Sequence, residues 1–509
     1  MSGTGRLVVV GDALLDRDVD GAADRTCPGA PALVLSEESS LERPGGAGWA
    51  ALLAAGGDLE VVLVAGVADD GAGARLHRLL SAAGVTVVPL PVRGPTAEKI
   101  RLRAGGQVLL RLDRGGDGHV PGPPPAAALA AVRSASAVLV SDYGRGATRQ
   151  PQLRAALAGT AAPVIWDPHP RGAPAVPGTR LVTPNEPELT ALTGRPAVPR
   201  AERGRWLAAV AAAAQQLRRR WRTGAVAVTL ARDGALLCHA GSTPLVVPVA
   251  APAEGDGCGA GDSFAAAAAG AVARGALVSE AVEAAVASAS AYVAGGGPAG
   301  VAGAAGAGRS AARAGTAAAG AAGAGGPAAA GAGDPGDVVA RVRERGGTVV
   351  ATGGCFDLLH AGHVATLQAA RAFGDCLVVC VNSDRSVARL KGPDRPLLPQ
   401  EDRVRLLSAL RCVDAVVVFD ETTPEAVLSR LRPDLWVKGG DYADGTATEP
   451  ELPEAELLRT WGGQAVVVPF LDGRSTSDLI AAARSGRSRT GAGGGSGPPE
   501  DYSRARRGA

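Results

Sequence analysis

The ten residues from Gly354 to His363, GCFDLLHAGH, hold the densest set of chemically useful side chains in the sequence. They follow a strand-like run at 348–352 and open a helix-like run at 364–372. Such a turn brings free backbone N–H groups and the positive end of a helix to one spot. His360 and His363 are three residues apart and share a helix face. Two of the six histidines therefore stand where a polyphosphate would bind.

A second glycine-rich turn, DGCGAGDSF at 256–264, precedes an alanine-rich helix. Its glycines leave consecutive N–H groups free, which suits a phosphoryl group in transfer. Asp262 at this position either caps the helix or takes a proton from an attacking sugar hydroxyl. Both roles are compatible with the glycine turn.

Two carboxylates follow the first strand-like run, Leu7–Gly11. Ligands in doubly wound sheets bind beyond the carboxyl ends of the strands, so Asp12 and Asp16 are placed to meet a polar substrate. Further along, Gly45 and Gly46 allow the backbone to approach a ligand closely.

Lysine is nearly absent, since only Lys99, Lys391 and Lys438 stand against 49 arginines. A coding bias toward Arg, Ala and Gly explains the scarcity. An ammonium and a guanidinium are not interchangeable at a phosphate, so each surviving lysine is a candidate for a specific contact.

Composition narrows the class of protein. A net charge of +2 argues against nucleic acid as the main partner, and no apolar run is long enough to span a bilayer. The first residues enter a strand without a basic-then-apolar signal, and the seven cysteines lack close pairing. We therefore expect a cytoplasmic protein with reduced thiols and no membrane partner.

The chain divides by composition. Residues 1–294 and 337–485 alternate strand-like and helix-like segments and are predicted to form two α/β domains. Residues 295–336 are almost entirely Gly and Ala with Pro, and are expected to form a flexible linker with transiently helical parts. Residues 486–509 are predicted to be a disordered tail. Because the linker has no periodic apolar face, we expect the domains to fold independently.

Residues 6–294 resemble the ribokinase-like (PfkB) sugar kinases, which have a three-layer α/β/α fold and the signature Asp-x-x-Gly-Ala-Gly-Asp. GDALLDRDVDG, EKIRLRAGGQVLLRLD, SDYGRG and TPNEPEL are similar to the kinase half of the bifunctional heptose kinase–adenylyltransferase family. The resemblance makes Asp262 the catalytic base. It implies ATP or anion-hole roles for Asn185, Glu188, Thr229, Gly234, Gly259, Ala260 and Gly261, and sugar-binding roles for Asp12, Asp16, Gly45, Gly46, Lys99 and Arg111.

Four positions depart from that family's pattern. Trp49 stands where sugar kinases carry Asn, and Cys258 replaces the Thr before Gly-Ala-Gly. His169 stands where this subfamily often has Lys, and Gly29 replaces a Glu. The departures bear on which sugar is bound more than on the kinase chemistry.

Residues 348–480 resemble the adenylyltransferase half of the same family, a Rossmann-like member of the HxGH nucleotidyltransferases. Gly354 replaces the usual Asn before x-Phe-Asp. The resemblance gives His360, His363 and Lys391 the role of neutralising charge on the phosphates. It implies nucleotide-binding roles for Gly354, Phe356, Asp357, Lys438, Asp441, Ser475, Thr476 and Ser477, and further site roles for Asn382, Asp384, Arg395 and Arg403.

The resemblance implies two reactions. In the first, ATP phosphorylates C1 of D-glycero-D-manno-heptose 7-phosphate; in the second, ATP adenylylates heptose 1-phosphate to give ADP-heptose and pyrophosphate. Mg²⁺ would be held mainly through phosphates, with Glu188 as the protein ligand to consider. The implied partners are sugar phosphates, ATP, a separate heptose-bisphosphate phosphatase and a second copy of the kinase domain.

Two alternatives stay open at this point. A different sugar kinase fused to a cytidylyltransferase of the glycerol-phosphate type would share the His-x-Gly-His and Ser-Thr-Ser/Thr motifs. A regulatory sugar-phosphate-binding protein with an inactive kinase half is the other. The Val-Lys-Gly-Gly-Asp-Tyr segment favours ADP-heptose over the first, and Asn185 and Asp262 argue against the second.

Overall fold

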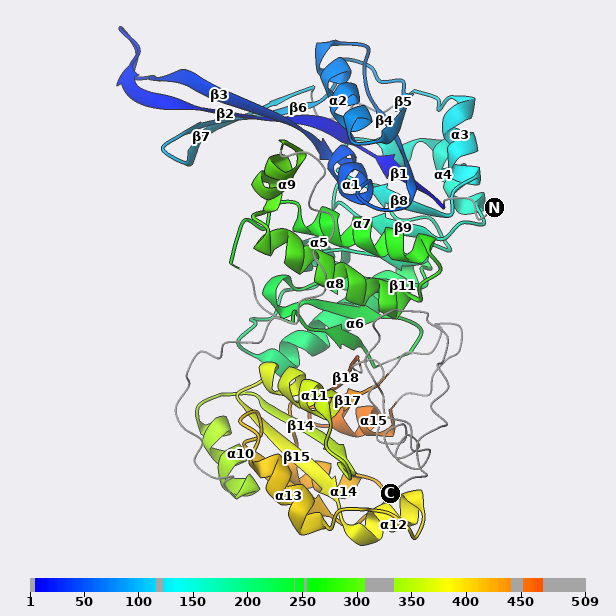
Figure 1. Ribbon diagram of the computed structural model, residues 1–509, viewed down its shortest axis with the longest axis vertical. Helices are drawn as coiled ribbons and strands as arrows, with labels where there is room; N and C mark the ends of the chain where they lie inside the picture. The colour runs from blue at the N-terminus through cyan, green and yellow to red at the C-terminus, as the bar shows by residue number, and fades with distance from the viewer. Residues whose placement is uncertain are drawn as a thin grey trace, which may run out of the picture.

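The protein consists of two α/β halves that follow one another along the long axis of the molecule (Figure 1). The computed structural model describes residues 5–115, 122–241, 243–250, 254–306, 334–440 and 452–469. In this part of the chain no helix has the length and apolar character needed to cross a bilayer.

The first half is built on a sheet with the strand order β13-β12-β11-β10-β9-β8-β1-β4-β5. The strands from β11 to β5 in that order run parallel. Strand β12 is antiparallel to β11, and β13 is antiparallel to β12. Its strands are β1 (Arg6–Gly11), β4 (Glu60–Gly66), β5 (Val85–Leu90), β8 (Ala137–Ser141), β9 (Val164–Asp167), β10 (Leu181–Val182), β11 (Ala225–Thr229), β12 (Ala235–Cys238) and β13 (Leu245–Val247).

Helices cover both faces of this sheet, which gives the three layers expected of a ribokinase-like fold. Successive residues of β1 alternate between the two faces, so Leu7 packs in one buried cluster and Val8 in the other. The helices are α1 (Ala47–Ala54), α2 (Gly71–Ala82), α3 (Ala126–Arg133), α4 (Pro151–Gly159), α5 (Glu186–Thr193), α6 (Arg203–Trp221), α7 (Ala260–Ala273), α8 (Val278–Ala294) and α9 (Gly297–Gly306).

A second, four-stranded sheet projects from the first half, and its long hairpin reaches well away from the body (Figure 1). We call it the lid sheet. Its strand order is β3-β2-β6-β7. The strands are β2 (Ala13–Thr26), β3 (Leu33–Gly46), β6 (Glu98–Ala104) and β7 (Gln107–Arg114).

The second half has a parallel sheet with the order β16-β15-β14-β17-β18, again with helices on both faces. This is the Rossmann-like arrangement expected of the nucleotidyltransferase half. Its elements are α10 (Pro335–Glu344), β14 (Val349–Gly354), α11 (Ala361–Ala372), β15 (Cys376–Asn382), α12 (Asp384–Lys391), α13 (Gln400–Ser408), β16 (Ala415–Phe419), α14 (Glu425–Leu431), β17 (Leu435–Gly439), α15 (Pro453–Arg459) and β18 (Gln464–Val468).

The two sheets meet edge to edge. Strand β13 of the first half pairs in parallel with β18 of the second, with Leu245 opposite Val467. The backbone N–H of Val467 donates to the carbonyl of Pro244 at 2.9 Å. The pairing joins the strands into one sheet of 14 strands. The sequence did not predict this contact, because edge strands pair through backbone groups that every residue carries.

The segment expected to be a linker is partly ordered. Helix α9 occupies 297–306 and α10 begins at Pro335, so both ends of 295–336 contribute to helices. Helix α9, GPAGVAGAAG, contains as many glycines as alanines, so helix propensity alone does not account for it. Residues 307–333, and the predicted tail at 486–509, lie outside the described residues.

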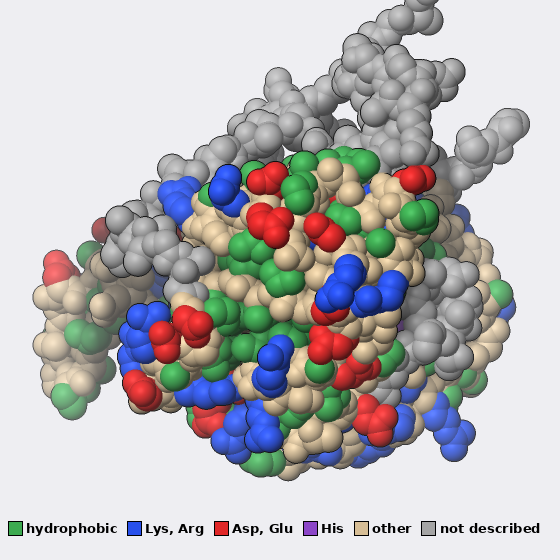
Figure 2. Space-filling view, turned by 90° about the horizontal axis from the view of Figure 1, so that it is seen from below, with side chains coloured by type: hydrophobic (Ala, Val, Ile, Leu, Met, Phe, Trp, Pro, Cys, Tyr) green, Lys and Arg blue, Asp and Glu red, His purple; other side chains and the backbone are tan. Residues whose placement is uncertain are grey.

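Charge is mixed on the surface. The face seen from below carries Lys or Arg side chains interspersed with Asp and Glu (Figure 2). This agrees with the small net charge of the chain, +2.

Candidate active sites

The first predicted site lies where β1 ends and the lid sheet begins. The Asp12 carboxylate accepts hydrogen bonds from the backbone N–H groups of Tyr143 (3.1 Å), Arg145 (2.9 Å) and Ala147 (3.0 Å). Asp12 is only 5% exposed. Its carboxylate therefore holds the loop after β8 at the edge of the site.

Asp16 belongs to a charged cluster on the lid strands. Its carboxylate lies 3.3 Å from Arg101, 3.9 Å from Arg43 and 4.0 Å from Lys99. Arg43 and Arg101 also bond Asp18, at 2.5 and 3.1 Å. Burial alone would raise the pKa of Asp18, but the two guanidinium groups lower it below the ordinary value.

Gly45 brings the backbone against the Asp16 carboxylate, and Gly46 brings it against the main chain of Asp12. A Cβ on Gly45 would lie 2.7 Å from an oxygen of Asp16, and one on Gly46 would lie 2.3 Å from the carbonyl oxygen of Asp12. Gly46 also has φ +58 as the residue that precedes α1. Both glycines are required by close approach. Arg111, by contrast, bonds Asp113 on the exposed strand β7 at 2.7 Å.

Asp262 lies in the first turn of α7 and is 8% exposed. Both of its oxygens accept from the hydroxyl of Tyr143, at 2.8 and 2.9 Å. Burial raises the pKa of Asp262 to about 7, although Tyr143 and Lys99 oppose the rise. Asp262 makes no helix-capping hydrogen bond, since Gly259 occupies the N-cap without a side chain. A carboxylate with a pKa near neutrality is suited to general-base chemistry.

Two departures from the kinase pattern meet at the glycine turn before α7. A Cβ on Gly259 would lie 2.7 Å from Nε1 of Trp49 and 2.6 Å from the hydroxyl of Tyr292. That hydroxyl donates to the carbonyl of Cys258 at 2.7 Å. Trp49 is thus buried against the turn, whereas Cys258 is exposed to solvent.

A cavity of about 520 Å³ opens beside this turn. Five of the predicted nucleotide-site residues line it: Asn185, Thr229, Gly234, Ala260 and Gly261. Its apolar wall includes Val249, Phe264, Val286, Ala289 and Val293, which sequence reasoning did not single out. Such residues carry no local signature, because the apolar side chains that line a ligand pocket are of the same types as those of the core.

Asn185 and Glu188 form a reciprocal cap at the start of α5. The Glu188 N–H donates to the Asn185 side chain at 2.8 Å, and the Asn185 N–H donates to the Glu188 carboxylate at 2.9 Å. Asn185 also bridges Thr229 at the end of β11. Burial raises the pKa of Glu188. The Asn-x-x-Glu motif therefore fixes the helix that borders the cavity.

Further carboxylates lie behind the site. Burial, followed by the charges of Glu188 and Asp262, raises the pKa of Asp167 well above its ordinary value. Burial also raises the pKa of Asp142 to about 6. His169 accepts from the N–H of Arg171 at 3.1 Å. Asp142, Tyr143 and Asp167 were not predicted as site residues, although the SDYGRG and WDPHP segments that carry them are visible in the sequence.

The second predicted site lies at the end of β14. His360 is the N-cap residue of α11, and its ring centroid lies 3.9 Å from that of His363. Burial, His360 and Lys391 lower the pKa of His363 to about 4. Its imidazole is therefore neutral at physiological pH and acts as a hydrogen-bonding group. Gly354 ends β14, and Phe356 packs against His363 with a centroid distance of 5.4 Å.

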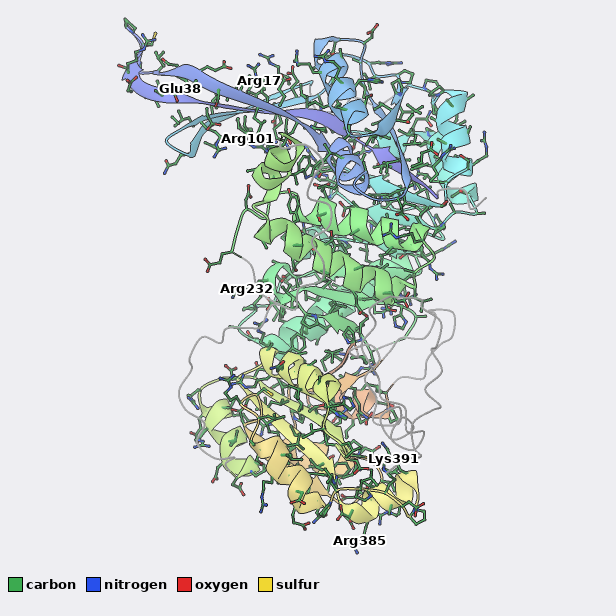
Figure 3. The ribbon with its side chains drawn as sticks, viewed as in Figure 1. Arg17, Glu38, Arg101, Arg232, Arg385 and Lys391 are labelled. Carbon is green, nitrogen blue, oxygen red and sulfur yellow. The ribbon has the colours of Figure 1, made fainter. Side chains whose placement is uncertain are left out.

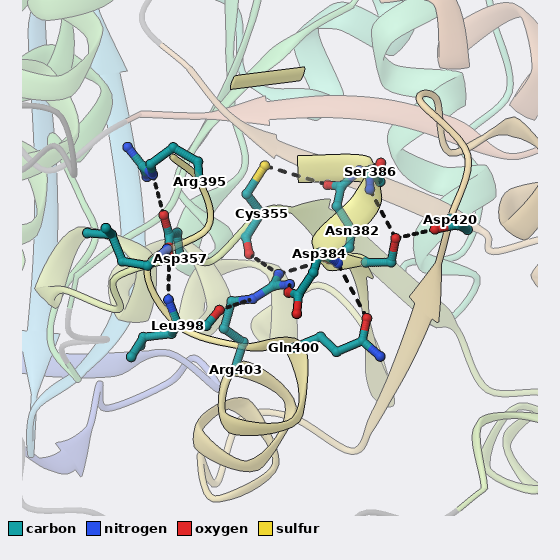
Figure 4. A network of polar contacts seen from close by, with 12 residues as sticks. Cys355, Asp357, Asn382, Asp384, Ser386, Arg395, Leu398, Gln400, Arg403 and Asp420 are labelled. Atoms are coloured by element: carbon teal, nitrogen blue, oxygen red, sulfur yellow. Dashed lines mark hydrogen bonds and ion pairs between the residues drawn. The ribbon is translucent and has the colours of Figure 1, made fainter. Parts of the chain in front are cut away.

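Arg403 joins the loops around this site (Figure 4). It is fully buried, and it donates to the carbonyls of Cys355 (2.6 Å) and Asn382 (2.8 Å) and to the carboxylate of Asp384 (2.6 Å). Together with the carbonyl of Leu398 at 3.1 Å, these partners occupy four of the five N–H groups of the guanidinium. Arg403 is thus a structural support of the site.

Asp357 has a similar supporting position (Figure 4). Its carboxylate accepts from Arg395 at 2.5 Å and from the N–H groups of Leu397 (2.6 Å) and Leu398 (3.1 Å). These bonds lower the pKa of Asp357 against the effect of burial. The carboxylate holds the 395–398 loop beside the histidines.

The two remaining lysines differ in their surroundings. Lys391 is exposed at the end of α12, near enough to His363 to lower its pKa. Lys438 lies 2.9 Å from Glu454 on α15, and its ammonium stands over the Trp436 ring. Four predicted residues, Asp441, Ser475, Thr476 and Ser477, lie outside the described residues.

Comparison with known proteins finds a family model for each half of the chain. A family model for the pfkB family carbohydrate kinases matches residues 4–302, and a cytidylyltransferase-like model matches residues 351–480. The first match includes most of helix α9. A solved ribokinase from Arabidopsis thaliana, complexed with ribose and ATP, is 24% identical, with a TM-score of 0.46 over 57% of this chain and 93% of its own.

Relatives similar over the full length are also found. The Bifunctional protein HldE of Streptomyces coelicolor is 54% identical over 94% of this chain and 97% of its own. That of Azorhizobium caulinodans is 38% identical over 94% of this chain and 98% of its own. The chain belongs to the HldE family of bifunctional proteins, with a pfkB-type carbohydrate kinase half followed by a nucleotidyltransferase half.

Proposed function

We propose that the protein is a bifunctional enzyme of ADP-heptose synthesis. Its first half phosphorylates C1 of D-glycero-D-manno-heptose 7-phosphate with ATP, and its second half transfers an adenylyl group from ATP to heptose 1-phosphate. The observation that carries the proposal is the presence of two separate sites in one chain that matches HldE proteins over 94% of its length. The sites use different chemistry, a carboxylate base in one and a histidine pair in the other.

In the kinase half, Asp262 takes the proton of the C1 hydroxyl as its oxygen attacks the γ-phosphorus of ATP. A pKa of about 7 leaves a useful fraction of Asp262 ionised at physiological pH and makes it a stronger base than an ordinary carboxylate. The N–H groups of the 257–261 turn and the start of α7 stabilise the transferring phosphoryl group. The nucleotide occupies the cavity between Asn185, Thr229 and the apolar wall.

The lid sheet supplies the sugar-phosphate contacts. Lys99 and Arg101 face Asp16 at the base of the lid (Figure 3 labels Arg101 there). A substrate that carries a phosphate would compete with Asp16 for these cations, so the cluster supports recognition of an anionic sugar. Arg111 would have to leave its exposed salt bridge with Asp113 in order to bind the sugar phosphate.

Magnesium would bind with ATP at the kinase site. The charges of Glu188 and Asp262 raise the pKa of Asp167, and the charge of Glu188 raises that of Asp262, so the site concentrates negative charge that a cation would neutralise. Among the residues that the structure describes, no cluster of three or more metal-ligating side chains is preassembled. This donor set fits an ion held mainly by substrate phosphates, with Glu188 as one ligand. The ion would shield the charge of the phosphates.

In the second half, the phosphate of heptose 1-phosphate attacks the α-phosphorus of ATP in line, without a protein nucleophile. His360 and His363 bind the phosphates by hydrogen bonds, and Lys391 adds the positive charge. The nucleotidyltransferase motifs end at residues outside the described part, so Ser475, Thr476 and Ser477 remain proposals from the resemblance.

The pathway requires a partner enzyme. The kinase product carries two phosphates, and a separate phosphatase would remove the 7-phosphate before adenylyl transfer. Arg101 and Lys391 lie toward opposite ends of the molecule (Figure 3). This separation favours release of the intermediate over transfer between the two sites. All seven cysteines are free, which supports the cytoplasm as the compartment.

We also propose that a second copy of the chain covers the lid sheet. Every residue of the edge strand β7 is exposed, including Val108, Leu109, Leu110 and Leu112. Leu33 is 61% exposed on the neighbouring hairpin. An apolar edge strand of this length favours association. Sedimentation should give a dimer, and Leu110→Glu should shift it toward the monomer; a monomeric unmodified protein would refute this interface.

Activity measurements on the whole chain test the two reactions. Asp262→Asn should lower phosphorylation of heptose 7-phosphate by about a hundredfold or more and leave adenylyl transfer unchanged. Asp58→Asn, at a 73% exposed carboxylate, is the matched control. In the second reaction ATP should be preferred to CTP. Kinase turnover that persists in Asp262→Asn, or a preference for CTP, would contradict the proposal.

A further inference from the structure

Tyr143 touches three separate parts of the kinase site. Its hydroxyl donates to both oxygens of Asp262, at 2.8 and 2.9 Å, and its backbone N–H donates to Asp12 at 3.1 Å. A Cβ on Gly46 would lie 3.4 Å from its ring. Tyr143 follows β8, whereas Asp12 follows β1, Gly46 precedes α1 and Asp262 begins α7. The backbone and the side chain of Tyr143 together therefore link elements that are distant in the sequence.

We propose that Tyr143 is a positioning residue that sets both the direction and the basicity of the Asp262 carboxylate. This rests on the proposed role of Asp262 as the base. A carboxylate side chain rotates about two bonds, and a single donor shared by both oxygens restricts that rotation. Without the hydroxyl, Asp262 would lose the only hydrogen bond to its side chain seen among the described residues.

The proton transfer defines what Tyr143 does. The O–H bond at C1 of the sugar breaks and its proton goes to one oxygen of Asp262. The electron pair left on the sugar oxygen forms the new bond to the γ-phosphorus, and the bond to ADP breaks. Tyr143 keeps its own proton throughout, because burial and the nearby Asp262 hold its pKa well above the ordinary value. It donates to the carboxylate before the transfer and stabilises the ionised form that acts as base.

Other titratable groups also face Asp262, and the Tyr143→Phe change leaves their side chains unaltered. They come from the lid sheet, the end of β9, α5 and α8: Lys99, Asp16, Asp167, Glu188 and Tyr292. The acidic members raise the pKa of Asp262 and Lys99 lowers it. Removal of the Tyr143 hydroxyl alone therefore has one expected direction, a further rise in that pKa.

Tyr143→Phe keeps the ring against Gly46 and removes only the hydroxyl. We expect kcat for sugar phosphorylation to fall about tenfold, with little change in KM for ATP. The acid limb of the pH profile for kcat/KM should move to higher pH, because the base then ionises at higher pH. Adenylyl transfer by the same molecules, and their melting temperature, report whether the chain is folded.

A double-mutant cycle separates positioning from general packing. In the Asp262→Asn background, Tyr143→Phe should have no further effect on the residual kinase rate. An unshifted acid limb with full kcat, or equal losses in both backgrounds, would overturn the inference. If Asp262→Asn itself retained kinase activity, the proposed base would fail instead, so the two failures are distinguishable.

Discussion

Lys391 carries one of three ammonium groups in the chain, and it is placed beside the histidine pair. It ends α12, is exposed, and lowers the pKa of His363. A compact ammonium can enter between phosphate oxygens where a planar guanidinium would be displaced. We therefore expect Lys391→Arg to lower adenylyl transfer at least tenfold, or about 1.4 kcal/mol of barrier, in a steady-state assay.

The control for Lys391→Arg is Arg405→Lys in the same half of the chain. Arg405 is 84% exposed and lies 4.0 Å from Asp402, a weak surface pair. This change should leave both activities as they are. Full adenylyl transfer in Lys391→Arg would mean that charge alone matters at position 391.

At the residue scale, the sequence predicted groups whose role depends on local spacing. His360 and His363 lie on one turn, and their ring centroids are 3.9 Å apart. Tyr143 could not be predicted in this way, because it is 119 residues from Asp262 and only the fold brings them together. For the same reason, the sequence did not predict that Asp357 and Arg403 support loops through hydrogen bonds.

At the scale of single elements, one turn holds a conformation that its residue disfavours. Ala231 has φ +53 in the turn between β11 and β12, and Gly234 in the same turn has φ +91. A side chain in the left-handed region costs about 1 kcal/mol. Ala231→Gly should therefore raise the free energy of unfolding by about 0.5–1 kcal/mol, measured by urea denaturation of the kinase transition.

Ala155→Gly serves as the control of opposite sign. Ala155 is exposed inside helix α4, where glycine costs about 1 kcal/mol relative to alanine. The two variants make the same chemical change in different backbone regions. A loss of stability in both would show that the turn carries no strain at position 231.

Elements with strong patterns were predicted with nearly correct bounds. The helix expected at 364–372 is α11, which begins three residues earlier because His360 takes the N-cap position. Helix α9 was expected only as a transient helix, since Gly/Ala composition alone does not show what a segment packs against. A Cβ on Gly297 would lie 2.6 Å from the carbonyl of Asp256, so the start of α9 lies beside the kinase turn.

At the scale of the whole molecule, the join between β13 and β18 changes what cleavage between the halves should do. The sequence predicts independent folding, and the shared sheet adds a contact between the halves. After cleavage within 307–333, we expect both activities to survive and the fragments to elute together on size exclusion. Independent elution of two active fragments would show that the join does not persist without the linker.

A variant can isolate that join. The Val467 N–H points to Pro244, so Val467→Pro removes the hydrogen bond across the join. The cleaved variant should separate more readily than the cleaved unmodified protein. An equal tendency to separate would assign the association to side-chain contacts instead.

The placement of the three lysines means that covalent labelling of amines can report ligand binding in the unmodified protein. Apart from the amino group of the first residue, every primary amine of the chain belongs to one of the three lysines. Lys99 lies beside Asp16, Lys391 lies near His363, and Lys438 forms a salt bridge with Glu454. An acylating reagent therefore modifies lysines in the proposed substrate regions, and it does not modify the arginines on the rest of the surface. Protection of Lys99 by a sugar phosphate, and of Lys391 by ATP, would map each ligand by peptide mass without a single substitution. For the same reason, amine coupling to a solid support would attach the enzyme mainly through side chains that are proposed to bind its substrates.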